Sequence, residues 1–115
     1  MGSFAAGQVV LLPFPFSDLS QNKFRPALLI ANADRGDWIA CQITSNPYAD
    51  SRAVKLTDSA FSDGNLRRES YARPGKLFTA NESLISTRVG TLTPAMLDKV
   101  RTAIATMILG KAQIS

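Results

Sequence analysis

The sequence predicts an α+β protein that is mainly β, with several short strands in a small, strongly curved sheet or barrel and one C-terminal helix packed against it. Short β-branched and apolar runs separated by turn-forming residues recur as far as Leu92. The only strong helical periodicity comes last. With 115 residues, 45% of them hydrophobic, and no repeat, low-complexity stretch or linker, the chain is expected to form one domain over residues 1–115.

The first strand is expected over residues 8–12, an apolar run between a glycine and a proline. Residues 13–23 contain two prolines and a polar tip, which indicates a loop. Two aromatic residues of this loop, Phe14 and Phe16, either pack into the core or offer faces on which bases can stack.

A second strand is predicted over residues 27–31, and the turn formers at 32–37 indicate a hairpin to a third strand over 38–44. Side chains alternate between the two faces of a strand, so one face of the third strand should be apolar. The residues of that face are Ile39, Cys41 and Ile43. Gln42 and Thr44 then share the opposite face.

The second half of the chain is expected to alternate short strands and connections. Residues 53–57 read as a strand, and the polar residues 58–68 as a surface segment that is either a plain connection or a mobile lid. Residues 70–73 and 76–79 are predicted as two strand pieces interrupted by a Pro-Gly pair. A short turn and a last extended piece are expected within 83–92.

The final helix has recognisable ends. Thr93 is its expected N-cap, Pro94 suits the first helical position, and Gly110 stands where a C-cap belongs. The apolar residues at helical spacing form one stripe: Met96, Leu97, Val100, Ile104, Met107 and Ile108. This stripe is expected to face either the core or a dimer partner.

The chain contains no histidine, which excludes several catalytic classes. A nucleophile activated by histidine cannot be assembled, and neither can the paired histidines of some ribonucleases. A zinc site would also need ligands that this chain does not have. Catalysis must therefore use arginine, lysine, carboxylates, hydroxyls or the backbone.

The single cysteine, Cys41, lies in an apolar run, where a packed thiol is expected rather than a nucleophile. One cysteine cannot form an internal disulfide, and no long apolar run or signal-peptide pattern is present, so a cytoplasmic location is expected. The net charge of +4 and the pI near 9.6 favour a polyanionic partner.

Arg25 and Thr44 are the strongest candidates for a site. Pro26 disfavours the helical region for Arg25, which should therefore be extended where a loop meets a strand. Thr44 stands at the end of the next strand. If these strands pair, a guanidinium and a hydroxyl meet at one rim of the sheet, an arrangement suited to gripping a phosphate. Alternatively, both are ordinary surface residues of a sheet.

The order and spacing of several short motifs resemble the PemK/MazF family of bacterial toxins over nearly the whole chain. The motifs are Gly7-Gln8-Val9-Val10, Phe14-Pro15-Phe16-Ser17-Asp18-Leu19-Ser20, Arg25-Pro26, Ile43-Thr44-Ser45, Ser70-Tyr71-Ala72-Arg73-Pro74, Leu77-Phe78-Thr79 and Arg88-Val89-Gly90-Thr91-Leu92. The resemblance implies an SH3-like curved barrel, a homodimer, and an endoribonuclease that cuts single-stranded RNA without metal or other cofactor. It also implies products with 2′,3′-cyclic phosphate and 5′-hydroxyl ends, and silencing by a cognate antitoxin.

The same resemblance places the catalytic arginine on Arg25 and the catalytic threonine on Thr44. The loop before Arg25 helps to shape the RNA path in this family, and here it departs from the common pattern. The residues expected to contact RNA are Ser20, Gln21, Lys23, Arg73 and Lys76. The general base is left open between Asp18, Glu69 and solvent, because arginine is a poor base near neutral pH.

Two other functions compete with the ribonuclease. A toxin of the same fold poisons DNA gyrase through a C-terminal tryptophan, glycine and isoleucine, but this chain ends in residues 111–115 without them and has its only tryptophan at Trp38. The second alternative is a nucleic-acid-binding module that does not cut. Such a module would bind RNA and leave it intact.

Overall fold

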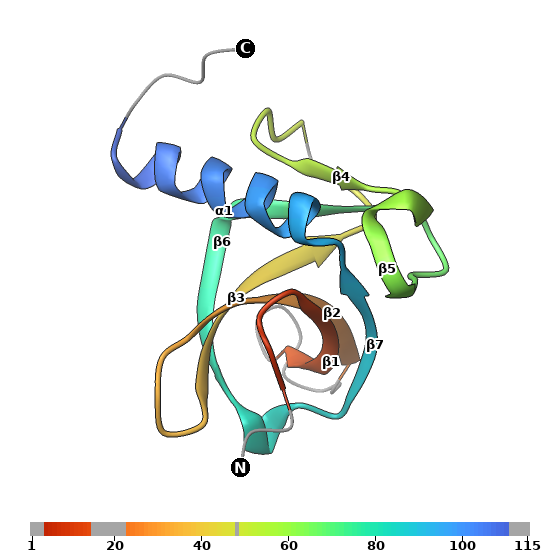
Figure 1. Cartoon of the computed structure of the whole chain (residues 1–115), viewed down its shortest axis with the longest axis vertical. Helices are drawn as coiled ribbons and strands as arrows, with labels where there is room; N and C mark the ends of the chain where they lie inside the picture. Colours follow the sequence, from red (N-terminus) through yellow and green to blue (C-terminus); the bar gives the residue numbers. More distant parts are fainter. Residues whose placement is uncertain (1–3, 15–22, 48, 111–115) are drawn as a thin grey trace.

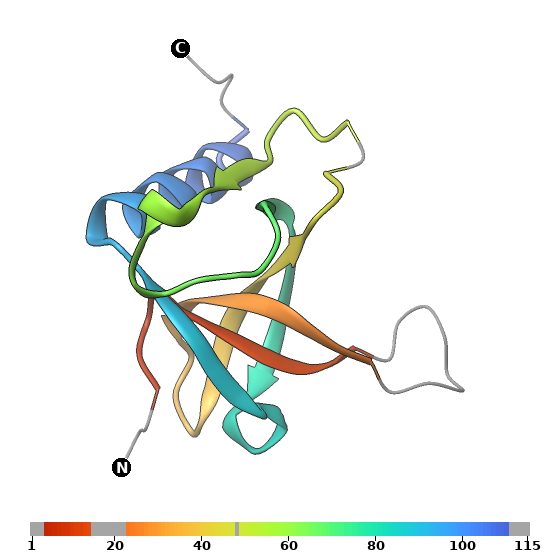
Figure 2. The same cartoon turned by 90° about the vertical axis from the view of Figure 1, so that its right-hand side faces the viewer.

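The computed structural model describes residues 4–14, 23–47 and 49–110 (Figure 1). In this part of the chain a seven-stranded sheet curves into a nearly closed barrel, and one long helix lies across β6 and beside β4 (Figures 1 and 2). The elements are β1 (Gln8–Phe14), β2 (Lys23–Asn32), β3 (Asp37–Thr44), β4 (Val54–Leu56), η1 (Asp58–Ala60), β5 (Phe61–Gly64), β6 (Ser70–Asn81), η2 (Glu82–Leu84), β7 (Thr87–Leu92) and α1 (Pro94–Ile108). The predicted fold class is therefore confirmed.

The strand order is β4-β6-β3-β2-β1-β7-β5, and every neighbouring pair is antiparallel. The edge strands β4 and β5 follow one another in the sequence and are joined through the single turn of η1. The two edges of the sheet are therefore connected covalently, although they do not pair with each other in the described residues.

Two apolar clusters lie on the two faces of the central strands. Leu28 and Ile30 of β2 pack into a cluster that includes Val100 and Ile104 of α1. The intervening side chains of β2, such as Leu29, pack into a second cluster on the opposite face. Both faces of β2 are buried, which explains why its sequence is continuously apolar rather than alternating.

The apolar face predicted for β3 is confirmed, because Cys41 and Ile43 are buried in the first cluster and Ile39 packs against it. The other face of β3 is buried over its first half, where Trp38 and Ala40 join the second cluster. Strands β1 and β2 extend beyond the predicted limits, to Phe14 and from Lys23 respectively. The prolines of these strands did not end them.

The predicted interruption at Pro74 is wrong, because β6 continues through it. Cys41 pairs with Leu77 and Ile43 with Ala72, so the extra residues of β6 form a bulge opposite β3. Within this bulge the missing N–H of Pro74 does not break a ladder of strand hydrogen bonds. The thiol of Cys41 donates to the carbonyl oxygen of Arg73 at 3.1 Å, which satisfies one backbone acceptor of the bulge.

Residues 58–68 lie mostly on the surface, as the sequence predicts, but they are not a plain connection. They contain η1 and the edge strand β5, which pairs with β7 through Phe61–Leu92 and Gly64–Gly90. Most of β5 is exposed and polar, which is common for an edge strand and explains why no apolar pattern revealed it.

The predicted ends of α1 are confirmed. The hydroxyl oxygen of Thr93 accepts a hydrogen bond from the Met96 N–H at 3.2 Å, and Gly110 has a φ of 73° after the last turn. Arg101 donates to the Ile30 carbonyl through Nε at 3.1 Å and Nη2 at 2.6 Å, which ties the helix to β2. Val100 and Ile104 of the predicted stripe are buried in the core, whereas Ile108 is 66% exposed, so of the two alternatives for the stripe the core does not hold for Ile108.

Candidate functional site

Arg25 and Thr44 lie on the same face of the sheet, near the end where β2 and β3 separate. The β2–β3 ladder pairs Leu28 with Cys41 and ends at Ala27 and Gln42. Arg25 and Thr44 each lie two residues beyond this last pair, so strand alternation puts both side chains on the same side of the sheet. Beyond the ladder β2 runs outward with β1, away from the end of β3 (Figure 2). A guanidinium and a hydroxyl therefore flank the opening between these two strands.

The Thr44 hydroxyl is fixed by the turn that follows its strand. It donates to the Asn46 carbonyl oxygen at 3.0 Å and accepts from the Asn46 N–H at 3.1 Å. Such local bonds are typical of threonine at a strand end, where the side chain replaces a missing backbone partner. The half-buried Thr44 side chain consequently has one defined orientation.

Arg25 is exposed and makes no hydrogen bond or ion pair with another residue in the described ranges. It pairs through its backbone with Leu12 of β1, which anchors the start of β2. Lys23, two residues earlier, is exposed on the same face by strand alternation. Lys23 and Arg25 thus place two positive charges next to each other at the start of β2, which is consistent with the predicted contact between Lys23 and RNA.

The row containing Thr44 continues across two more strands. Thr44 pairs with Tyr71 of β6, and Tyr71 pairs with Lys55 of β4, so the three side chains share one face. Lys55 Nζ lies 3.1 Å from a carboxylate oxygen of Glu69, and the Tyr71 hydroxyl lies 3.5 Å from the other. The hydrogen bond and charge of Glu69 raise the pKa of Lys55 above its ordinary value.

Tyr71 and Lys55 were not singled out from the sequence. The only available signal was Tyr71 within the Ser70–Pro74 motif, because the cross-strand pairing of β4 with β6 was unknown.

Arg73 and Lys76 both lie in the β6 bulge and line one hollow of about 380 Å³. Arg73 is half-buried, and its Nε lies 3.1 Å from Asp50 Oδ2. Lys76 is exposed. The structure therefore brings together two residues that the sequence placed on the RNA path, and adds Arg52 to them, because Arg52 lines the same hollow.

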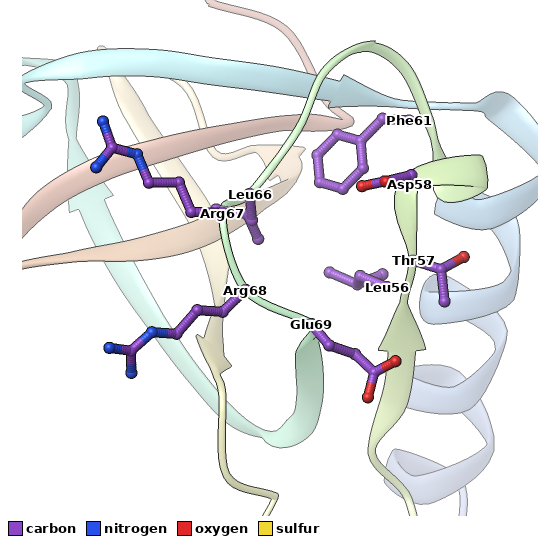
Figure 3. Close-up of a pocket in the computed structure, with 8 residues that line it drawn as sticks. All are labelled: Leu56, Thr57, Asp58, Phe61, Leu66, Arg67, Arg68 and Glu69. Atoms are coloured by element: carbon purple, nitrogen blue, oxygen red, sulfur yellow. The ribbon is translucent and has the colours of Figure 1, made fainter.

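A second hollow, of about 260 Å³, lies between β4, η1 and the segment that leads into β6 (Figure 3). Its apolar lining comes from Leu56, Phe61 and Leu66. Two cations on its rim, Arg67 and Arg68, are matched by two carboxylates of the lining, and Figure 3 shows both arginine side chains directed away from the hollow. This hollow has no excess of positive charge and is a poor match for an anion.

Four residues of the sequence interpretation lie outside the described residues: Ser20, Gln21, Asp18 and Phe16. The side chain of Phe14 is also outside the described part. Their expected roles in RNA recognition, proton transfer or packing remain predictions from the sequence.

Residues 5–108 match the family of PemK-like, MazF-like toxins of type II toxin–antitoxin systems. This chain belongs to that family. The match spans the β1–β2 connection, the Arg25 and Thr44 strands and the closing helix. No curated protein gives a match to this sequence.

Solved structures share this fold at low sequence identity. An endoribonuclease in complex with its cognate antitoxin from a mycobacterial species is 20% identical with a TM-score of 0.69, covering 99% of this chain and 100% of that one. An endoribonuclease from a mycobacterial species is 22% identical with a TM-score of 0.70, covering 99% and 98%. A MazE–MazF structure from Deinococcus radiodurans is 20% identical with a TM-score of 0.66, covering 93% and 95%.

The buried thiol of this MazF-like toxin agrees with the sequence reading. Burial raises the pKa of the Cys41 thiol from 9.0 to about 12, as expected for a packed thiol rather than a nucleophile. Within the described residues, no three side chains of histidine, cysteine, aspartate or glutamate gather as metal ligands would. In the same part of the chain, α1 is not long and apolar enough to span a membrane.

Proposed function

We propose that this toxin is an endoribonuclease that cuts single-stranded RNA without a metal, using Arg25 and Thr44. The observation that supports the proposal is that both residues stand two positions beyond the last pair of the β2–β3 ladder, on one side of the sheet, where the two strands separate. Family membership and the two endoribonucleases of the same fold support this reading. The whole chain acts as a single toxin domain.

The reaction is a displacement at phosphorus by the neighbouring 2′-oxygen. A bond forms between the 2′-oxygen and phosphorus while the bond to the 5′-oxygen breaks, and the products carry a 2′,3′-cyclic phosphate and a 5′-hydroxyl. One proton leaves the 2′-hydroxyl and one reaches the departing 5′-oxygen. Dependence on the 2′-hydroxyl makes RNA the substrate rather than DNA.

Arg25 binds the scissile phosphate. Its planar guanidinium can donate two parallel hydrogen bonds to phosphate oxygens, and its charge stabilises the additional negative charge of the transition state. The loss of one such preorganised donor typically lowers a rate by about 10²–10³.

Thr44 orients the 2′-hydroxyl. Its only proton is donated to the Asn46 carbonyl and one lone pair accepts from the Asn46 N–H, so one lone pair remains to accept a hydrogen bond. A 2′-hydroxyl can donate to that lone pair, whereas a phosphate oxygen cannot. These two hydrogen bonds therefore support a role for Thr44 in orienting the nucleophile rather than in donating to the phosphate.

The proton acceptor is Asp18 or solvent rather than Glu69. Glu69 is held by Lys55 and Tyr71, and β6, which it precedes, is two strands away from the strand of Arg25.

The toxin acts in the cytoplasm as a homodimer and is neutralised by a cognate antitoxin. Its net charge of +4 suits an acidic antitoxin segment that folds as it binds. The apolar side chains of Ile108 and Leu109, which are 66% and 67% exposed at the end of α1, supply surface for a dimer contact. Light scattering over a range of concentrations measures the oligomeric state.

The decisive experiment incubates purified toxin with a long end-labelled RNA in excess EDTA, with Arg25→Ala in parallel. We expect discrete cuts with cyclic-phosphate ends from the wild type and at least about a hundredfold slower cutting by the variant. Circular dichroism checks that Arg25→Ala is folded. Intact RNA from folded, antitoxin-free wild type would overturn the proposal, and equal cutting by the variant would overturn the role of Arg25.

A further inference from the structure

The hollow beside the β6 bulge has the charge of an anion site. It is lined by Arg52, Arg73 and Lys76 but by only one carboxylate, that of Asp50. Its volume of about 380 Å³ is near the lower end of the range for small-ligand sites, so it suits a single group better than a continuous protein segment. The Figure 3 hollow, where the charges balance, has no such excess.

The Arg73–Asp50 pair gives this hollow a fixed wall. The Asp50 carboxylate accepts from the Arg52 N–H at 2.9 Å and from Arg73 Nε at 3.1 Å, so it joins the β3–β4 connection to the bulge. The backbone N–H of Arg52, followed by the Arg73 side chain, lowers the pKa of Asp50 below its ordinary value. Asp50 therefore stays ionised and holds Arg73 in place at neutral pH.

Unlike Arg73, Arg52 and Lys76 are not held in place by a salt bridge within the described residues. Both residues are exposed, and neither forms a salt bridge with another residue that the structure describes. They can therefore turn toward a ligand in the hollow without first breaking an ion pair.

The hollow lies near the row of side chains that carries Thr44, and Met107 of α1 forms its far wall. Tyr71 lies directly opposite Thr44, and Arg73 follows two residues later in β6, where the bulge begins. Two strand residues span about 6–7 Å. An RNA strand that leaves the scissile position can thus cross Tyr71 and bring its next phosphates to the hollow.

From this arrangement we infer that the hollow binds a backbone phosphate of the RNA, away from the one that is cut, through Arg52 and Lys76. Arg73 is the positioning residue of this subsite, because its guanidinium is already held by Asp50. The inference rests on the proposed ribonuclease function and adds a second phosphate contact to it. Phosphate contacts carry no base specificity, so the subsite raises affinity for any sequence.

The test measures RNA binding in the Arg25→Ala background, in which cutting is expected to be at least about a hundredfold slower and the RNA therefore survives the measurement. Fluorescence anisotropy of a labelled single-stranded RNA is recorded between 50 and 200 mM salt, with EDTA present, for proteins that also carry Arg52→Ala or Lys76→Ala. We expect each substitution to weaken binding about tenfold. The slope of log K against log salt should fall by about 0.7 for each cation removed.

Matched controls separate a local contact from a general loss of charge. Arg67→Ala removes an arginine from the rim of the other hollow, and Lys99→Ala removes an exposed lysine from α1. Both should bind RNA within about twofold of the parent protein. In proteins that keep Arg25, Arg52→Ala and Lys76→Ala should raise KM and leave kcat nearly unchanged, because the contact is made equally in the ground and transition states.

The outcomes distinguish this inference from the proposed function. Unchanged affinity and salt slope in both Arg52→Ala and Lys76→Ala overturn the subsite, and would direct the hollow instead to an acidic segment of the antitoxin. Equal weakening by the Arg67→Ala and Lys99→Ala controls also overturns it. If the wild type leaves RNA intact while Arg52→Ala and Lys76→Ala still weaken binding selectively, the subsite stands and the nuclease proposal fails.

Discussion

At the scale of single residues, Arg25 and Thr44 present complementary hydrogen-bonding groups. The guanidinium of Arg25 has only donors, which suit phosphate oxygens. The Thr44 hydroxyl, with its proton committed to Asn46, offers only an acceptor, which suits a hydroxyl donor. A ribose 2′-hydroxyl beside a phosphate is the group that matches both, and this match does not depend on the base.

The acceptor role of Thr44 predicts different results for two small substitutions. Thr44→Ser keeps a hydroxyl that can form the same turn with Asn46, so kcat should fall by no more than about threefold. Thr44→Val keeps the shape but removes the acceptor, so kcat should fall at least about tenfold, the effect of one hydrogen bond to a reacting group. Single-turnover cleavage measures both, and a fully active Thr44→Val would show that the hydroxyl is not required.

The buried thiol of Cys41 predicts a specific pH dependence of stability. Its pKa is about 12 in the folded protein and 9.0 is the ordinary value, so above pH 9 the unfolded chain loses a proton that the folded chain keeps. The stabilisation is complete below pH 9 and is lost as pH rises from there toward 12. The contribution of this thiol lowers the free energy of unfolding by at most about 1.4 kcal/mol for each unit of pH.

Urea unfolding of the wild type and of Cys41→Ala between pH 8 and pH 11 measures this effect. The variant should be less stable at pH 8 because it leaves a cavity, but its stability should decline less steeply above pH 9. Other groups also titrate in this range, so the difference between the two slopes is the relevant quantity. Parallel curves would mean that the thiol does not titrate differently in the two states.

At the scale of elements, β5 and β7 approach each other through two glycines. A side chain at Gly64 would collide with the backbone carbonyl of Val89. A Cβ at Gly90 would lie 2.8 Å from the Asp63 carbonyl oxygen and 2.9 Å from the Phe61 ring. The edge strand can therefore pair closely only where side chains are missing from both strands.

Gly90→Ala should destabilise the fold by about 1–3 kcal/mol, since the new methyl group meets backbone that cannot move away easily. Gly75→Ala is the matched control, because a Cβ there would meet only Met107 Sδ, at an ordinary 3.7 Å. Urea unfolding of both variants gives the comparison. Equal stabilities would show that β5 moves aside without loss.

The sequence predicted the elements whose signal is local. The alternation of β3 and the caps of α1 were correct, because apolar spacing and capping residues act within a few positions. The bulge around Pro74 and the edge strand at 61–64 were missed, because each depends on a partner strand far along the chain. For the same reason the sequence supplied Arg25 and Thr44 but not Arg52, which joins Arg73 only through tertiary structure.

At the scale of the whole molecule, the sheet depends on contacts between distant parts of the chain. β1 pairs with β2, its neighbour in sequence, but also with β7, and β3 pairs with β6. Non-local pairing requires large loops to close before the contacts form, which slows folding.

The toxin should therefore refold in milliseconds to seconds rather than microseconds. Trp38, the only tryptophan of the sequence, is a suitable probe because it is 4% exposed and its indole N–H donates to Glu82 at 3.0 Å. Stopped-flow fluorescence after dilution from urea measures the rate. A main phase in microseconds would contradict the expectation, and Trp38→Phe identifies any signal that does not come from this residue.

The covalent join between β4 and β5 is also what closes the barrel in the described residues. Among the residues that the structure describes, these two edges are connected by η1 and not by a ladder of hydrogen bonds, and the Ala60 carbonyl of η1 accepts from the Thr93 N–H at 2.9 Å. A single protease cut within η1 would remove this covalent connection. The barrel would then become an open sheet with β4 and β5 as its two unconnected edge strands. The short turn from Asp58 to Ala60 is thus the segment that joins the two edges of the sheet.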